Sequence, residues 1–170
     1  MNGKKIIILC AALCSLVLGS CTVKYSFTGA SISPEVKTFS VQPFNNNAQM
    51  VAPILAPTLT NTLQDKFSRT TSLAPVSQDG DMAFEGTVTS YTSTPTAVTA
   101  NELASKNRLT ITIKVKYTNR FDPKQNFDKT FTAFQDYDNT QLLQSVEGTL
   151  IPEIVDDLVD QVFNASAANW

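Results

Sequence analysis

The sequence of 170 residues contains no histidine, and this absence excludes several classes of function at once. Without imidazole there is no Ser-His-Asp triad, no Cys-His dyad and no histidine-ligated metal site. Charged side chains are also scarce, at 16% of the chain, whereas 42% of the residues are hydrophobic. Such a composition excludes an intrinsically disordered protein and is typical of a globular one.

Motifs that bind phosphate or provide a serine nucleophile are missing as well. The chain has no G-x-G-x-x-G, no Walker-type G-K-[ST], no G-x-S-x-G and no S-x-x-K sequence. Any catalysis would therefore depend on carboxylates. We expect neither an enzyme nor a cofactor. The length predicts a single domain that buries roughly two thirds of the surface of the unfolded chain.

The first 20 residues have the character of a bacterial export signal. Lys4 and Lys5 give a charged start, and within residues 6–18 only Ser15 is clearly polar. This apolar stretch is shorter than the about 20 residues that a membrane-spanning helix needs. We interpret residues 1–20 as a signal peptide that is removed.

The sequence Leu18-Gly19-Ser20-Cys21 resembles the lipobox of bacterial lipoproteins. Small side chains suit cleavage by a protease at the membrane surface, and only a thiol can carry the thioether-linked lipid. Two or three acyl chains on Cys21 would anchor the protein stably, at about 0.8 kcal/mol per buried CH₂ group. The alternatives are a plain secretory signal that ends near a cysteine by chance, and a buried structural cysteine.

The lipobox would leave no free thiol in the mature chain. Cys10 and Cys14 would be removed with the signal peptide and Cys21 would be capped by lipid, which excludes thiol catalysis and redox switching. Loss of Lys4 and Lys5 would leave 11 basic and 15 acidic side chains, a net charge of −4. We divide the mature chain into a lipidated tether (residues 21–34) and one domain (residues 35–170).

Alternation of apolar and polar residues predicts strands over residues 36–44, 82–91, 108–120 and 126–134, and a short one over 73–77. The clearest is 108–120, in which odd positions from Leu109 to Tyr117 are apolar and even positions are polar. The Asp79-Gly80 pair favours a tight hairpin before the strand that begins at Met82. Residues 92–107 are rich in Thr and Ser and predict a loop, and residues 122–124 predict a turn.

Two helices are predicted from apolar residues that recur every three or four positions. The first begins near Ala56, because Pro53 and Pro57 are tolerated only before or within its first turn. Its apolar positions are Leu55, Leu59, Leu63 and Phe67. The second is capped near Asn139 or Thr140, and Pro152 within it predicts a kink or a break into two helices. Its apolar stripe consists of Leu143, Val146, Leu150, Ile154, Leu158 and Val162.

The acidic residues have ordinary structural interpretations. Asp79 and Asp81 flank a glycine in a predicted turn, where Asp binds nearby backbone groups. Asp156, Asp157 and Asp160 fit the solvated side of a helix. The loop that contains Asp79 and Asp81 lacks the ligand pattern of a calcium-binding EF-hand.

Charge is distributed unevenly along the chain. Residues 106–129 contain seven basic and two acidic residues, whereas residues 130–170 contain seven acidic residues and no basic one. We expect a domain with two oppositely charged ends. A regular pleat would place Arg108, Lys114, Lys116 and Arg120 on one non-core face, which suits an anionic partner. The alternative is an ordinary solvated face whose lysines discourage edge pairing. Nucleic acid is excluded as a partner, because no aromatic residues interleave with these cations and the pI is near 5.0.

The mature chain resembles the Bacteroidetes branch of the LptE family, the lipopolysaccharide-assembly lipoproteins. The resemblance covers nearly all of the mature chain. It lies in Cys21, in Tyr25-Ser26-Phe27-Thr28-Gly29-Ala30-Ser31-Ile32, in Phe84-Glu85-Gly86, in Asn107-Arg108-Leu109-Thr110-Ile111-Thr112-Ile113 and in Ile154-Val155-Asp156-Asp157-Leu158-Val159.

The resemblance implies a fold class with which the predicted order of elements agrees. This is an α+β two-layer sandwich, with two helices packed on one face of a mostly antiparallel four-stranded sheet. It also implies an outer-membrane lipoprotein on the periplasmic side, located in the lumen of the LptD β-barrel, that helps to deliver lipopolysaccharide to the cell surface. Cys21 then corresponds to the lipidated residue, and Thr22-Val23-Lys24 lacks the acidic run of surface-exposed lipoproteins.

On this interpretation Arg108, Lys114 and Lys116 contact the phosphates of lipid A or acidic residues of the barrel lumen. Two other functions stay open. The first is a periplasmic lipoprotein that scaffolds another envelope complex without binding lipopolysaccharide. The second is an enzyme that uses two carboxylates as acid and base, which would need two acidic residues about 5 to 10 Å apart in a concave pocket.

Overall fold

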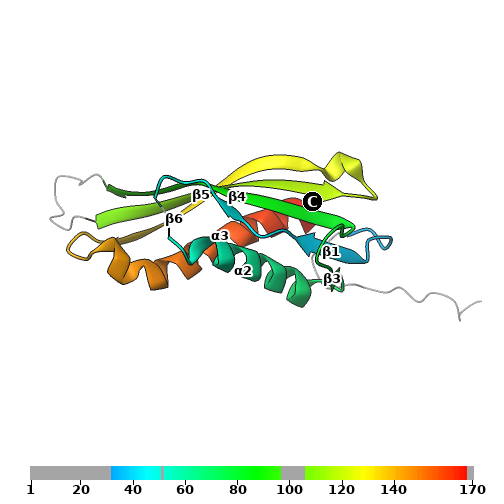
Figure 1. Cartoon of the computed structure of the whole chain (residues 1–170), viewed down its shortest axis with the longest axis horizontal. Helices are drawn as coiled ribbons and strands as arrows, with labels where there is room; N and C mark the ends of the chain where they lie inside the picture. Colours follow the sequence, from blue (N-terminus) through cyan, green and yellow to red (C-terminus); the bar gives the residue numbers. More distant parts are fainter. Residues whose placement is uncertain (1–31, 51, 97–105, 168–170) are drawn as a thin grey trace, which may run out of the picture.

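A computed structural model describes residues 32–50, 52–96 and 106–167 of the chain. Helices α2 (Leu55–Thr70) and α3 (Leu143–Ala167) lie together on one side of a sheet (Figure 1). In the described ranges no α-helix covers the opposite side, which we call the open face. The predicted α+β two-layer arrangement, with both helices on one face, is confirmed.

The sheet has six strands, in the order β3-β1-β4-β5-β6 with β2 paired to β4. The strands are β1 (Thr38–Val41), β2 (Asn45–Asn46), β3 (Ala74–Pro75), β4 (Met82–Pro95), β5 (Lys106–Asn119) and β6 (Phe127–Asp138). Strands β4, β5 and β6 are antiparallel, whereas β1 runs parallel to β3 and β4, and β2 runs parallel to β4. The prediction of four mostly antiparallel strands is therefore only partly right. The sheet is mixed because α2 carries the chain back along the sheet before β3, and such a crossover joins parallel strands.

Within the strand predicted over residues 36–44 only β1 forms, and the unpredicted strand β2 follows after Pro43 and Phe44. Gln42 still donates its backbone N–H to the carbonyl of Phe84 at 2.9 Å, but Phe44 donates to the hydroxyl of Thr60 in α2 at 3.0 Å. Pro43 has no N–H to offer to a sheet. The chain therefore leaves β4 for two residues, Pro43 and Phe44, and returns to it at Asn45.

The Asp79-Gly80 turn does not form the predicted hairpin. Strands β3 and β4 are not neighbours, because β1 lies between them. Asp79 has a positive φ of 54°, and the hydrogen bond from Gly80 N–H to Ser40 Oγ, 3.2 Å long, connects the turn to β1. The turn is therefore shaped by a strand about 40 residues earlier in the chain.

The loop predicted over residues 92–107 is strand at both of its ends, over residues 92–95 and 106–107. Strand β4 continues to Pro95 and β5 begins at Lys106, with Thr94 opposite Arg108; the remainder, residues 97–105, lies outside the described residues. Threonine favours the pleated sheet, and this preference outweighs the polar character of the segment. A bulge between Val88 and Ser90 shifts the alternation by one residue, so that Tyr91 is buried on the same side as Val88.

The apolar positions of α2 form the centre of the core, as predicted. Leu55, Leu59, Leu63 and Phe67 are all 0% exposed, and α2 begins within one residue of the expected start. Burial of each such side chain stabilises the fold by about 1.5–3 kcal/mol relative to exposure.

The ring of Phe67 connects the two layers. Its centroid lies 5.5 Å from that of Phe39 in β1, 4.8 Å from that of Phe84 in β4 and 5.1 Å from that of Phe163 in α3. All three separations fall in the range of favourable aromatic pairs. One side chain thus packs against two strands and the other helix.

Helix α3 runs from Leu143 to Ala167 as one element, so of the kink or break predicted at Pro152 the break into two helices does not occur. A proline in a helix crowds the carbonyl four residues earlier, which here belongs to Gly148. Gly148 has open space around it, so the helix backbone can shift there and continue past Pro152. The predicted stripe packs on the sheet, with its first two members partly buried and the rest buried. Within the described ranges, no helix combines the length and apolar character needed to cross a membrane.

Gly86 allows the segment before β2 to pack against β4. A Cβ atom at position 86 would lie far inside contact distance of the buried Phe44 ring. We predict that Gly86→Ala lowers the free energy of unfolding by about 1–3 kcal/mol, the usual cost of overpacking. Urea denaturation measures the change.

Gly148→Ala is the matched control, because nothing lies within 4 Å of a Cβ at that helical position. It should raise the free energy of unfolding by about 0.5–1 kcal/mol through helix propensity. Equal effects of the two substitutions would contradict the packing of Phe44 on Gly86.

Candidate functional site

The predicted row of cations on β5 lies on the open face. Residues of β5 from Leu109 to Tyr117 alternate between buried and exposed or partly exposed, and Arg108, Lys114 and Lys116 belong to the second set. Arg120 lies beyond Asn119, the last residue of β5, and its backbone N–H donates to the carbonyl of Asp81 at 2.9 Å. The strand thus presents three of the four predicted cations.

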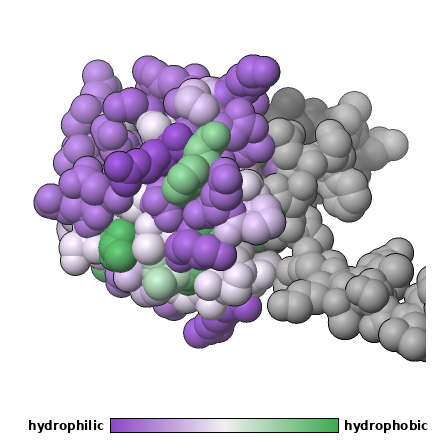
Figure 2. Space-filling view, turned by 90° about the vertical axis from the view of Figure 1, so that its right-hand side faces the viewer, coloured by the Kyte–Doolittle hydropathy of each residue, from purple (hydrophilic) through white to green (hydrophobic). Residues whose placement is uncertain are grey.

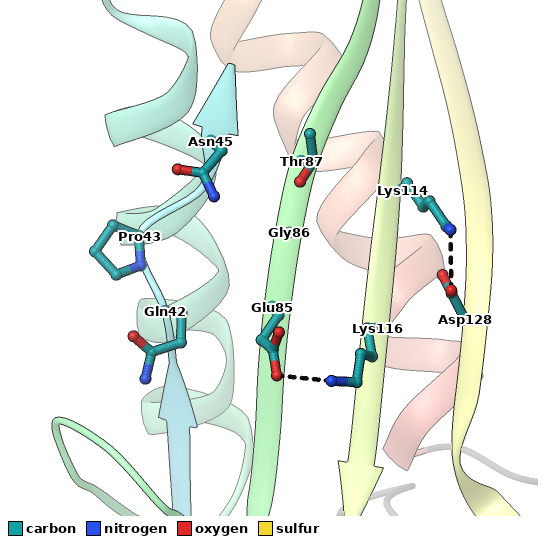
Figure 3. A pocket seen from close by; sticks show the side chains of 9 residues that line it. All are labelled: Gln42, Pro43, Asn45, Glu85, Gly86, Thr87, Lys114, Lys116 and Asp128. Atoms are coloured by element: carbon teal, nitrogen blue, oxygen red, sulfur yellow. Dashed lines mark hydrogen bonds and ion pairs between the residues drawn. The ribbon is translucent and has the colours of Figure 1, made fainter. Parts of the chain in front are cut away.

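Each of these three cations has a carboxylate partner on a neighbouring strand. Arg108 pairs with Asp136 at 2.7 Å, Lys114 with Asp128 at 2.9 Å and Lys116 with Glu85 at 3.1 Å. Figure 3 shows the two lysine pairs, with Glu85 on β4 and Asp128 next to β6's start. The open face therefore carries alternating charge of both signs rather than the uniform positive row that the β5 sequence alone suggests.

The charge separation predicted along the chain is partly cancelled in space. Asp136 belongs to the acidic carboxyl-terminal stretch, but antiparallel pairing of β6 with β5 places it directly opposite Arg108. Asp160 of α3 likewise pairs with Lys66 of α2 at 2.7 Å. Strand register and helix packing thus bring together charges that lie far apart in the sequence.

Arg108 has the most constrained side chain of the row. Its Nε and one terminal nitrogen donate to the two oxygens of Asp136 at 2.7 and 2.9 Å. Its guanidinium carbon lies 3.8 Å from the ring centre of Phe134, a cation–π contact. The hydrogen bonds from Arg108 lower the pKa of Asp136, and those to Asp136 raise the pKa of Arg108. Phe134 is 47% exposed, so the open face has an apolar surface beside this pair.

A shallow hollow of about 730 Å³ lies on the open face around the two lysine pairs. One wall is the segment between β1 and β2, and the rest is formed by β4, β5 and β6 (Figure 3). The lining residues are Gln42, Pro43, Asn45, Glu85, Gly86, Thr87, Lys114, Lys116 and Asp128. Sequence reasoning missed Gln42, Pro43 and Asn45, because only the parallel placement of β1 and β2 beside β4 brings them to the lysines.

A second, more apolar hollow of about 510 Å³ lies near the starts of α2 and α3. Met50 and Leu142 line it, and Leu142 is 76% exposed. At its base the hydroxyl of Tyr91 donates to Glu147 at 2.5 Å.

The end of the molecule that faces the viewer in Figure 2 shows mostly hydrophilic residues where it is not grey, so exposed apolar side chains are few on that end.

One carboxylate of the predicted Asp79-Gly80-Asp81 turn has a structural role. Asp81 is a structural residue, but its partners are not local: its Oδ2 accepts from the N–H groups of Lys37 and Thr38 in and before β1, at 2.9 and 3.0 Å. In the described part of the chain no group of three or more His, Cys, Asp or Glu side chains could hold a metal ion. Cys21 lies outside the described residues.

The fold and the site define a small two-layer domain with a polar, charge-paired open face. A model of the LptE family, described as lipopolysaccharide-assembly, matches residues 36–166. The chain therefore belongs to the LptE family. Proteins of this family are outer-membrane-associated lipoproteins of lipopolysaccharide assembly.

Comparison with solved structures finds similar chains at low sequence identity. The hypothetical protein CT253 from Chlamydia trachomatis is 8% identical, with a TM-score of 0.51 over 79% of this chain and 99% of that chain. The minor lipoprotein from Acinetobacter baumannii is 18% identical, with a TM-score of 0.48 over 75% of this chain and 90% of that one. The PelC dodecamer from Paraburkholderia phytofirmans is 10% identical, with a TM-score of 0.42 over 76% and 92%. Among curated proteins no match was found.

The contact between Asp81 and β1 should make the stability of the fold depend on pH. Hydrogen bonds from the backbone N–H groups of Lys37 and Thr38 lower the pKa of Asp81, so its carboxylate stabilises the fold fully above the unfolded pKa of about 3.9. This contribution is lost as the pH falls through the lower, folded pKa. Asp81→Asn should therefore lower the urea midpoint at pH 7, and the difference from the wild type should shrink as the pH falls below about 3.9.

Asp79→Asn in the same turn is the control and should leave the midpoint unchanged, because Asn also tolerates the positive φ at this position. A constant difference between Asp81→Asn and the wild type from neutral to acid pH would exclude the proposed role of the carboxylate.

Proposed function

We propose that this protein partners an LptD-type outer-membrane β-barrel in the delivery of lipopolysaccharide to the cell surface. The observation that carries the proposal is the family match, which extends over residues 36–166 and thus over nearly the whole described domain. We place the protein on the periplasmic side of the outer membrane or in the barrel lumen, attached through an acylated Cys21.

The open face is the surface we assign to these contacts. The outward side chains of β5 from Arg108 to Lys116 are threonines and paired charges, which suit the wet lumen of a large barrel better than an apolar interface. The opposite face of the sheet is not available, because α2 and α3 cover it. The surface is therefore built from strands whose inner side chains are locked in the core.

Arg108, Lys114 and Lys116 are the proposed contact residues for lipid A phosphates or acidic side chains of the lumen. Lys114 and Lys116 have side chains that are 53% and 57% exposed. Exposed ion pairs are worth about 0–1 kcal/mol, so each lysine can exchange its carboxylate at little cost. A new charge-assisted hydrogen bond then contributes about 1.5–3 kcal/mol.

One observation favours the second candidate function, a scaffold for a different envelope complex that does not bind lipopolysaccharide. All three cations are already neutralised by carboxylates, and a surface of balanced charge also fits a protein partner. The identity of the partner that co-purifies decides between the two.

The lipid anchor is tested by Cys21→Ala in the native host. We expect the wild-type protein to begin at an acylated Cys21 by mass analysis, to sediment with outer membranes and to bring down a barrel of LptD size from detergent extracts. The variant should lose the acyl mass and the membrane association, since no other lipid attachment is proposed. An intact leader or an unmodified thiol in the wild-type protein would overturn this placement, and an unrelated partner would favour the scaffold.

The contact surface is tested by the double variant Lys114→Glu, Lys116→Glu. It replaces two exposed cations and repels Asp128, Glu85 and any anionic partner, so we expect lipopolysaccharide binding and barrel recovery to fall by about tenfold or more. Binding is measured with purified lipopolysaccharide, and barrel recovery by pull-down.

Lys66→Glu is the control, because it also reverses the charge of a lysine that is paired with a carboxylate, Asp160, but on the helix side of the domain. It should leave both measurements unchanged. Unchanged binding and recovery in the double variant would remove these lysines from the contact surface.

A further inference from the structure

We infer that the hollow on the open face binds the hydroxyl groups of a saccharide rather than a bare phosphate. This inference rests on the proposed function in one respect, that the saccharide is the glycan part of lipopolysaccharide. At Lys114 and Lys116 it replaces the lipid A phosphate with the glycan hydroxyls as the bound group. The ligand class follows from the lining of the hollow, from Gln42 on one wall to Asp128 on the other.

The charges that line the hollow are balanced. Lys114 is bound to Asp128 and Lys116 to Glu85, so two cations face two carboxylates. A phosphate accepts hydrogen bonds and repels carboxylates, and it would have to displace Asp128 and Glu85 to reach either lysine. A hydroxyl group instead accepts from the lysine and donates to the carboxylate, and both ion pairs stay intact.

The remaining side chains also offer donors and acceptors together. The amides of Gln42 and Asn45 each provide both, and so does the hydroxyl of Thr87. Figure 3 shows the two amides on the wall opposite the lysine pairs, with Pro43 between them. Neighbouring hydroxyls on a sugar ring need this mixture, and the Pro43 ring provides the one apolar surface in the lining.

The wall that carries Gln42, Pro43 and Asn45 is fixed by contacts behind it. The buried ring of Phe44 packs on Gly86, and the Phe44 backbone N–H donates to Thr60 of α2 at 3.0 Å. Gln42 and Asn45 are hence held at a set distance from β4. Because this wall is already ordered before a ligand arrives, binding costs less conformational entropy of the protein.

The test uses the glycan of lipopolysaccharide after removal of its acyl chains, in a phosphorylated form and in a form from which the phosphates have been removed. Binding is followed by calorimetry and by backbone amide shifts of the full domain, with inorganic phosphate as a third probe. We expect the two glycans to bind with similar affinity, to shift the amides of Gln42, Asn45 and Thr87, and not to be displaced by phosphate.

The variant Asp128→Asn distinguishes the two ligand chemistries by the sign of its effect. A saccharide site loses a charged acceptor, and charge-assisted hydrogen bonds are about twice as strong as neutral ones, so affinity for both glycans should fall about fivefold. A phosphate site would instead gain, because Lys114 is freed from its carboxylate. The control Asp160→Asn removes an equally exposed carboxylate that pairs with Lys66 on the helix side, and it should leave affinity unchanged.

Tighter binding of the phosphorylated glycan by Asp128→Asn, a strict need for phosphate, or no effect of the substitution would overturn the saccharide site. These outcomes leave the proposed function standing if the barrel still co-purifies with the wild-type protein. Binding of the phosphate-free glycan without recovery of any barrel would overturn the partnership and support the saccharide site.

Discussion

The contact on which the rest of the structure depends is the packing of Phe67 against both layers. Its ring contacts Phe39 and Phe84 on the sheet and Phe163 on the second helix. This contact fixes α2 and α3 on the same face, and the polar face of the sheet is left open as a consequence. The aromatic series continues through Tyr117, whose ring stacks on Phe84 at 5.0 Å and contacts Phe127 at 5.1 Å. This packing holds the inner residues of β4, β5 and β6 in register. It therefore also fixes which charged side chains lie opposite one another on the open face.

Strand register, more than composition, decides the character of the candidate site. The sequence of β5 alone presents cations without carboxylates, and a strand of that kind is typical of a phosphate-binding surface. Pairing with β4 and β6 supplies one carboxylate for each cation, with Glu85 directly opposite Lys116 and Asp136 directly opposite Arg108. The same residues therefore form a surface with both donors and acceptors. This is why the contact partner is better judged from the strand register than from net charge.

The elements that were predictable from the sequence are those whose periodicity is strong and local. The alternation in β5 and the four-residue repeat of α2 are direct consequences of one-sided burial, and both were found where expected. The missed features depend on contacts between distant segments. Insertion of β1 between β3 and β4 contradicts the local preference of Asp79-Gly80 for a hairpin, and the bulge before Ser90 changes which residues of β4 face the core. Gln42 and Asn45 could not be assigned to the site from the sequence. Their positions depend on β1 and β2 running parallel to β4, and no local sequence pattern determines that direction.

The position of β1 has a consequence for how the chain assembles. Strand β1 comes first in the chain, yet its two neighbours in the sheet begin at Ala74 and Met82. Strands β4, β5 and β6 are consecutive and pair with one another as an antiparallel meander, so none of these pairings involves the amino-terminal segment. Until β1 arrives, the edge of β4 from Met82 to Phe84 is bare and open to pairing with another chain. Until β1 pairs, the chain thus has an unprotected strand edge at the place that this strand occupies in the folded domain.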